Sequence, residues 1–234
     1  MALDEVLLLE VATGRRSPSI RFWRWMEPAL VVGSHQSVSN EVDEEVARGH
    51  GFVITRRLSG GGTMLAQPGG TITYSIYAPQ DLVDGLSFVD SYAFLDGWLI
   101  DALRSLGVAA EHRPVNDVIT PRGKLAGAAQ ARRRGAVLHH TMVAYALDPE
   151  LVPALIRIGR PRVSERGLRS AEKAVSPLAW FVQLSLAEVE EHLVSWFARD
   201  HDLEAATIGA DSEVDARSLA RRKYATDAWI YRLP

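Results

Sequence analysis

The sequence predicts a single domain of the α+β class, in which strands and helices share one core. Its 234 residues are enough for one large domain, and no repeat, low-complexity tract or linker divides them. Residues 71–77 alternate with a period of two and are rich in β-forming side chains, which predicts a strand. Residues 87–106 instead carry apolar side chains at helical spacing and are followed by Gly107, which predicts a helix and its end.

The amino-terminal half contains most of the predicted strands. The apolar segment 5–10 is compatible with a buried strand or with the start of a helix. Strands are predicted over residues 19–25, 28–33, 52–55 and 71–77. The acidic stretch 40–48 is predicted to form a short solvated helix capped by Asn40. Because the last two strands flank the sequence RRLSGGG, we expect a glycine-rich turn between them.

The carboxyl-terminal half is predicted to add two strands and three helices. The strands cover residues 115–119 and 136–147, and the segment 121–129 between them indicates a hairpin or a loop over a pocket. Helices are predicted over residues 148–158, 185–197 and 214–223. The second of these helices opens with the capping-box pattern Ser185-Leu-Ala-Glu188.

The composition excludes several classes of function. The formal net charge is −3 at pH 7, so no global excess of charge favours nucleic acid or a membrane surface. No apolar run is long enough to cross a bilayer and no signal-peptide pattern is present, so the predicted location is the cytoplasm. The chain has no cysteine, which rules out disulfides, thiolate metal sites and a cysteine nucleophile.

The run Gly60-Gly61-Gly62 needs an explanation, because each glycine loses much backbone entropy on folding. Backbone N–H groups without side chains in the way can surround a phosphate, and Arg56 or Arg57 can add a bidentate charged partner. A flexible hairpin turn with surface arginines is the alternative. The glycine spacing matches neither a dinucleotide fingerprint nor a P-loop.

Lys124 lies among small residues in the sequence RGKLAGAA, which leaves room for a ligand against the backbone. A lysine in this setting can neutralise a phosphate or a carboxylate in a transition state, although a solvated loop lysine is the alternative. Asn116-Asp117 lies one short turn earlier. Asp117 is a candidate ligand for Mg²⁺, with turn capping as its alternative.

His139 and His140 are expected to point to opposite faces of a strand, one toward the core and one toward the exposed side of the sheet. No third ligand of suitable type and spacing accompanies them, so metal binding is not predicted. The run Arg132-Arg133-Arg134 is interpreted as a solvated loop.

Taken together, these motifs resemble those of the lipoate–protein ligase A family, within the superfamily of biotin and lipoate ligases. The resemblance rests on TRRLSGGG, NDVI, GKLAGAA and VLHHTMVAYALD in this order, with RFWRWMEPALVVGSHQS upstream and SERGLRS and RRKYATDAWIY downstream. It covers nearly the whole chain. It implies one catalytic domain over residues 1–234, with a mixed, largely antiparallel sheet flanked by helices, similar to class II aminoacyl-tRNA synthetases and biotin synthetases.

The resemblance also implies a set of site residues. Arg57 corresponds to an arginine that contacts the nucleotide. Lys124 corresponds to the catalytic lysine, which contacts the α-phosphate and the acyl carboxyl oxygen. Met64 and Leu65, with Phe88, are expected to line a channel for the acyl chain. The candidate nucleotide- and lipoate-binding residues are Arg57, Ser59, Gly60, Gly61, Gly62, Thr63, Met64, Leu65, Asn116, Asp117, Lys124, Gly127 and His140.

The activity that the resemblance implies is lipoate–protein ligation with ATP, Mg²⁺ and lipoate, through a lipoyl-AMP intermediate. The implied partners are lipoyl-carrier domains of 2-oxoacid dehydrogenases or of glycine cleavage proteins, with no nucleic acid and no membrane. Two features depart from the family pattern. Many members continue the glycine run into a histidine-aspartate pair, where this chain has Ala66-Gln67. The sequence also leaves no room for the small carboxyl-terminal domain of larger members, so we expect a separate accessory protein to assist adenylate formation.

Three alternatives stay open at this point. Octanoyl or lipoyl transfer through a thioester enzyme intermediate needs a cysteine, so only a cysteine-independent transferase is compatible with the sequence. A biotin ligase is disfavoured because its glycine- and arginine-rich loop pattern does not occur. A non-catalytic module that binds an acyl group or a nucleotide is the third, and the Ala66-Gln67 departure favours it.

Overall fold

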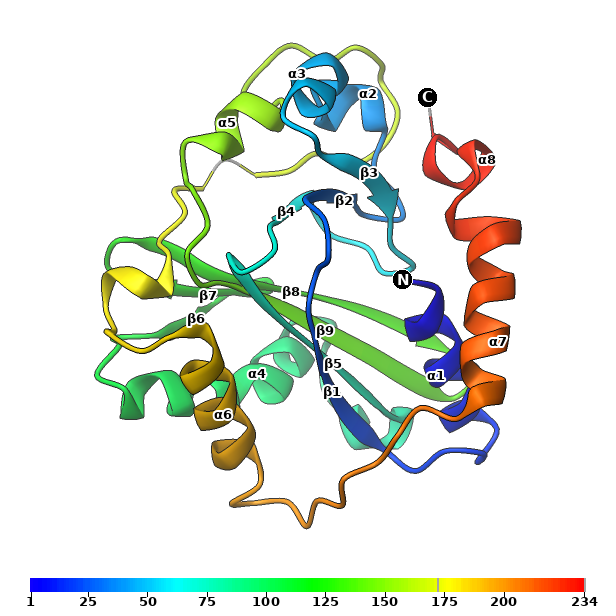
Figure 1. Cartoon of the computed structure of the whole chain (residues 1–234), viewed down its shortest axis with the longest axis vertical. Coiled ribbons are helices and arrows are strands. Elements are labelled where there is room, and N and C mark those ends of the chain that lie inside the picture. Colours follow the sequence, from blue (N-terminus) through cyan, green and yellow to red (C-terminus); the bar gives the residue numbers. More distant parts are fainter. Residues whose placement is uncertain (172, 234) are drawn as a thin grey trace.

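The computed structural model describes residues 1–171 and 173–233, and in this part of the chain the strands form two sheets (Figure 1). The larger sheet has six strands in the order β1-β5-β9-β8-β7-β6, and every pairing in it is antiparallel. Its strands are β1 (Ser19–Trp23), β5 (Thr71–Pro79), β6 (Glu111–Arg113), β7 (Asp117–Thr120), β8 (Gly123–Arg133) and β9 (Ala136–Ala144).

The smaller sheet has three strands in the order β3-β2-β4, namely β3 (Val53–Arg56), β2 (Ala29–Val32) and β4 (Met64–Ala66). Strand β2 runs parallel to β3 and antiparallel to β4. The expected mixed, largely antiparallel architecture is therefore confirmed, and the glycine run lies in the loop between β3 and β4.

Helices cover both faces of the larger sheet. On one face, α4 (Phe88–Ser105) and α6 (Leu186–Phe197) pack their apolar side chains on those of β5. On the other face, α1 (Ala2–Ala12) packs against β5 and β9, and α7 (Ala210–Leu219) packs on α1. Figure 1 shows α1 and α7 side by side, with α6 on the opposite side of the view. No helix in the described part of the chain is long and apolar enough to span a bilayer.

Short helices surround the smaller sheet. Helices α2 (Val38–Glu41), α3 (Glu44–Gly49) and α5 (Leu151–Leu155) contribute to the cluster of apolar side chains that packs on β2. Helix α8 (Asp227–Ile230) contacts β3 near the carboxyl end of the chain. Single turns of 3₁₀ helix cover Gln80–Val83 and Leu178–Trp180, and a wider helical turn over Ala220–Tyr224 continues α7.

Several expected elements differ from the structure. Residues 5–10, which were compatible with a buried strand or with the start of a helix, form part of helix α1. The acidic stretch 40–48 forms two helices with a break at Val42, and Asp43 rather than Asn40 caps the second. The segment 121–129 is mainly strand β8, and only its first residues form the turn of a hairpin with β7. The hairpin alternative is thus confirmed and the loop alternative is wrong; the small side chains carry no periodic signal that would have shown the strand.

His139 and His140 lie on β9 and point to opposite faces of the sheet, as predicted. His139 Nε2 lies 2.7 Å from Oδ1 of Asp96 on α4, whereas His140 Nδ1 lies 3.9 Å from Oδ2 of Asp4 on α1. The expectation that one ring faces an exposed side is wrong. The two residues are 0% and 7% exposed because helices cover both faces.

Candidate active site

The glycine loop, residues 57–63, is held close to the end of β2. A Cβ atom added at Gly33 would lie 2.1 Å from the carbonyl oxygen of Gly61, so only glycine permits this approach of the two backbones. Gly61 itself has a φ of +86°, in the region that favours glycine. On the outer side, a Cβ atom at Gly62 would lie 3.1 Å from Oγ of Ser170. The bare backbone of this loop is therefore needed for contacts within the protein.

The side chain of Arg57 holds the backbone of the glycine loop in place. Its guanidinium donates hydrogen bonds to the carbonyl oxygens of Val31 at 2.8 Å, Gly60 at 2.6 Å and Gly62 at 2.7 Å. The residue is 2% exposed, and burial lowers its pKa to about 10. The expected contact of Arg57 with a nucleotide stays a prediction, and in this conformation its guanidinium is engaged with backbone carbonyl oxygens. Sequence spacing does not reveal that the side chain points inward.

Ser59 and His140 also belong to a buried network. Oγ of Ser59 lies 2.6 Å from Nε2 of His140, and Ser59 is 1% exposed. Burial lowers the pKa of His140. Beyond His140, the carboxylate of Asp4 accepts hydrogen bonds from Arg21 and Tyr77. This network connects the glycine loop to helix α1. Ser59 therefore helps to hold the loop in place.

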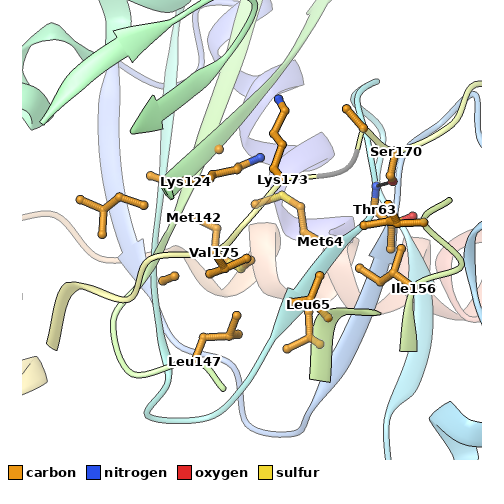
Figure 2. Close-up of a pocket in the computed structure, with 17 residues that line it drawn as sticks. Thr63, Met64, Leu65, Lys124, Met142, Leu147, Ile156, Ser170, Lys173 and Val175 are labelled. Atoms are coloured by element: carbon orange, nitrogen blue, oxygen red, sulfur yellow. Dashed lines mark hydrogen bonds between the residues drawn. The ribbon is translucent and has the colours of Figure 1, made fainter. Parts of the chain in front are cut away.

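A largely apolar cavity opens beside the glycine loop (Figure 2). Five of the predicted site residues line it: Thr63, Met64, Leu65, Lys124 and Gly127. Figure 2 shows further walls from Met142 of β9, Leu147, Ile156 and the segment that carries Ser170, Lys173 and Val175. Phe88 is not among the lining residues. It lies half exposed at the start of α4, where the guanidinium of Arg132 stacks over its ring, so its expected place in the channel is wrong.

A second, smaller cavity adjoins the first. The two cavities share Met64 and Met142 as a common wall. The smaller cavity is otherwise lined by Trp23, Trp25, Val31 and Thr73, with Arg57, His140, Thr141 and Met1. Methionine side chains are unbranched and adaptable. Only these two adaptable side chains are therefore common to the walls of both cavities.

Three charged groups meet at the polar end of the larger cavity. Nζ of Lys124 lies 2.8 Å from Oδ1 of Asp117, and Nζ of Lys173 contacts Oδ2 of the same carboxylate. Burial alone would raise the pKa of Asp117, but the two ammonium groups outweigh it and hold that pKa below its ordinary value. Burial lowers the pKa of Lys124, and Asp117 opposes this shift. The site therefore carries two cations against one anion.

This arrangement does not fit the expected role of Asp117 as a ligand for Mg²⁺. Both oxygens of its carboxylate already face ammonium groups, which repel a divalent cation. Within residues 1–171 and 173–233, no group of three or more acidic or histidine side chains is placed to hold a metal ion. We therefore assign no step to a metal held by this chain.

The backbone around Lys124 explains how the lysine is positioned. A Cβ atom at Gly127 would lie 2.5 Å from Nζ of Lys124, so glycine leaves space for the ammonium group. Asn116 donates a hydrogen bond to the carbonyl oxygen of Ala128, tying β7 to β8 beside the lysine. The backbone of Lys124 also exchanges hydrogen bonds with Ala174 and Ser176, which brings Lys173 to the site. Sequence reasoning missed Lys173, because this pairing spans about fifty residues without a local signal.

Residues near Ser170 close the cavity over the glycine loop. The backbone N–H of Thr63 donates to Oγ of Ser170 at 2.8 Å, and Oγ of Ser170 donates to the buried carboxylate of Glu41. Gln36 accepts a hydrogen bond from the hydroxyl of Thr63 at 3.0 Å and donates to Ser170. These contacts hold the segment around Ser170 on the glycine loop. Glu41 and Ser170 were also missed, since only the fold brings them together.

An open cleft also reaches Lys124. Its polar and charged lining includes Glu111, Arg113, Asp117, Thr120, Lys124 and Lys173, and Pro121 and Gly123 also line it. Lys124 and Lys173 border both the apolar cavity and this cleft. A molecule with an anionic part can therefore lie in the cavity with its negative charge at the two lysines, while a second reactant enters through the cleft.

Comparisons with known proteins agree with this geometry. The family described as "Lipoyl protein ligase A/B catalytic domain" matches residues 1–198. Octanoyltransferase LipM of Kyrpidia tusciae is 32% identical over 262 residues, covering 99% of this chain and 93% of the relative. A crystal structure of lipoate-protein ligase A bound with ATP has a TM-score of 0.83 at 26% identity and covers 100% of this chain and 93% of its own.

A further solved structure comes from an archaeal lipoylation system of Thermoplasma acidophilum, described as a bipartite lipoate protein ligase and its E2 lipoyl domain. It has a TM-score of 0.80 at 25% identity and covers 99% of this chain and 92% of its own. These three similar proteins thus include both a transferase and ligases, and each covers nearly the whole chain.

Proposed function

The chain belongs to the lipoyl protein ligase A/B catalytic domain family, and from this premise we propose that it uses an acyl-adenylate to attach lipoate to a lysine of a carrier domain. The observation that carries the proposal is the position of Lys124, between an apolar cavity and an open cleft. Membership of the family makes the chain an enzyme of the lipoate ligase and transferase group; the choice of adenylate chemistry is the proposal.

The proposed reaction has two steps. An oxygen of the lipoate carboxylate attacks the α-phosphorus of ATP, the new O–P bond forms and pyrophosphate leaves. The neutral amine of the carrier lysine then attacks the acyl carbon, the bond from that carbon to the AMP oxygen breaks, and the amine gives up a proton. Negative charge develops on phosphate oxygens in the first step and on the carbonyl oxygen in the second. Lys124 is placed to stabilise both charges.

The two cavities suit the two parts of lipoyl-adenylate. The larger cavity offers polar groups from Thr63, Ser170 and the two lysines, which a nucleotide needs. The smaller cavity is walled by indole rings and by Met64 and Met142, which suit an apolar acyl chain. We infer that the acyl chain extends past the two methionines, and that the carbonyl carbon lies at Lys124. This keeps Met64 of the expected acyl channel, leaves Leu65 in the wall of the larger cavity, and puts Trp23 and Trp25 in place of Phe88.

A cysteine-independent octanoyltransferase is the second candidate, because the relative from Kyrpidia tusciae is named an octanoyltransferase. A thioester-linked intermediate on the enzyme requires a thiol, and this chain has no cysteine. A transferase built on this chain would need direct attack of the carrier lysine on the donor thioester. The acceptors that we propose are lipoyl-carrier domains of 2-oxoacid dehydrogenases or of glycine cleavage proteins.

An accessory protein is also proposed, since the ligase from Thermoplasma acidophilum is bipartite. Closing a lid over a reactive anhydride excludes water from it, and a second protein can supply such closure. Acting alone, this chain is expected to pass lipoate from preformed lipoyl-adenylate to a carrier, and to make the adenylate from ATP slowly or not at all.

The test compares three acyl donors on the purified chain, with an apo lipoyl domain as acceptor. Synthetic lipoyl-adenylate should support rapid modification, whereas lipoate with ATP should support little without an added protein. Robust turnover with lipoate and ATP would reject the need for a partner. Transfer from an octanoyl-carrier protein alone would establish the transferase instead. Failure with every donor would favour a non-catalytic binding module.

A further inference from the structure

An exposed arginine and tryptophan lie at the edge of the cleft that leads to Lys124. Arg122 occupies the turn between β7 and β8, and its neighbours Pro121 and Gly123 line the cleft. Its guanidinium stacks over the ring of Trp180, 4.3 Å from the ring centroid. Trp180 is 45% exposed although it is a large apolar residue. Arginine and tryptophan are among the residues that contribute most to binding energy at protein interfaces.

The stacking leaves the hydrogen-bonding edge of Arg122 free. A guanidinium that stacks through its flat face still presents its N–H groups in the plane, where they match a carboxylate. In the part of the chain that the structure describes, no acidic side chain forms an ion pair with Arg122. The side chain is therefore ordered against Trp180 and available to an acidic group from another molecule.

Charge extends from this edge into the cleft. Arg113, Lys124 and Lys173 line the cleft, and its two carboxylates are those of Glu111 and Asp117, the second of which is already paired with both lysines. The edge at Arg122 continues this positive surface outward. A partner whose amine must reach Lys124 therefore passes a surface that favours negative charge beside that amine.

From these contacts we propose that Arg122 and Trp180 form the docking point for the carrier domain, and that Arg122 pairs with an acidic side chain close to the acceptor lysine. This inference rests on the proposed function, because it takes the carrier as the molecule that enters the cleft. The stack holds the carrier at the edge while the acceptor amine reaches the acyl group. Arg122 is then a residue that selects the acceptor and does not touch the reacting atoms.

The test separates docking from chemistry by using two acceptors. Enzyme loaded with synthetic lipoyl-adenylate is mixed with either an apo lipoyl domain or hydroxylamine, a small amine that needs no docking surface. Arg122→Glu should raise the lipoyl-domain concentration that gives half the maximal rate by about tenfold or more. The rate with hydroxylamine should stay within about twofold of the parent. Added salt should weaken carrier use by the parent enzyme and have less effect on the variant.

A matched control is available just beyond the end of α6. Arg199 stacks over Trp196 at the same centroid distance of 4.3 Å, at the carboxyl end of that helix and outside the residues that line the cleft. Arg199→Glu should leave both acceptors unaffected. Trp180→Ala should weaken the use of the lipoyl domain only.

Each other outcome contradicts a distinct part of the account. If the parent and Arg122→Glu reach half the maximal rate at the same lipoyl-domain concentration, Arg122 is not part of the docking point. Equal losses with both acceptors would place Arg122 at the adenylate and overturn docking as well. If the parent enzyme transfers lipoate to hydroxylamine but to no lipoyl domain, the carrier is the wrong partner. If it transfers to neither acceptor, the proposed function fails and the docking inference fails with it.

Discussion

Lys124→Ala is expected to lower the single-turnover rate of lipoyl transfer from preformed lipoyl-adenylate by about 10²–10³-fold. The substitution removes the ammonium group that lies between the cavity and the cleft, so the phosphate and carbonyl oxygens lose a positive partner. Asp117 keeps its contact with Lys173, so the carboxylate is not left unpaired in the protein. The melting temperature should therefore change much less than the rate, which rapid-quench kinetics and thermal unfolding can compare.

Lys223→Ala provides the matched control for this prediction. Nζ of Lys223 lies 2.6 Å from the carboxylate of Glu5, and its side chain is 22% exposed, against 29% for Lys124. Lys223 lies in the helical turn that follows α7, outside the candidate site. Its loss removes a comparable ion pair and should leave the transfer rate near that of the parent. Equal rates for Lys124→Ala and the parent would show that Lys124 is a solvated side chain without a role in the reaction.

Gly33→Ala is expected to have the second-largest effect, because its new Cβ atom would lie 2.1 Å from the carbonyl oxygen of Gly61. The glycine loop or the end of β2 must move by about 1 Å to relieve this contact, and such a displacement at a reactive site can lower the rate by about 10²-fold. Overpacking of this kind typically costs about 1–3 kcal/mol of stability. Transfer kinetics and thermal unfolding of the variant test both expectations.

The same chemical change has the opposite expected effect at Gly97. This residue lies inside α4, and no atom lies within 4 Å of the Cβ that alanine adds there. Gly97→Ala should stabilise the protein by about 0.5–1 kcal/mol, because glycine is unfavourable in a helix interior. Unchanged transfer by Gly33→Ala, measured beside this control, would contradict the tight fit between β2 and the glycine loop.

The sequence predicts those elements whose side-chain pattern is long and regular. Strand β5 and helix α4 were predicted because alternation and helical spacing persist over many residues. Strand β4 has three residues directly after the glycines, too few for a pattern, and it was missed. Residues 121–129 were predicted as a hairpin or a loop, and the extent of strand β8 was missed because alanines and glycines give the same signal on either face. Helix α8 has four residues and was also missed.

Sequence motifs also predicted part of the candidate site. Lys124 and the residues from Gly62 to Leu65 were identified from motifs, and most of them line the cavity; their role in binding stays a proposal. Arg57, Ser59 and His140 were grouped with them; all three are buried, and of these Arg57 and His140 line the smaller cavity. A motif shows that residues are close in sequence without showing which way they point. Lys173 reaches the site only through the pairing of its segment with β8.

The central claim is that the acyl group passes from an adenylate to a carrier lysine at Lys124 without bonding to this chain. Intact-mass analysis of a quenched single turnover tests it most directly, with the enzyme, synthetic lipoyl-adenylate and an apo lipoyl domain in one mixture. The account predicts that the lipoyl domain gains one lipoyl group at the rate at which AMP appears, and that the enzyme keeps its unmodified mass at every time point. A lipoyl group that appears on the enzyme first and then declines as the lipoyl domain is modified would contradict it.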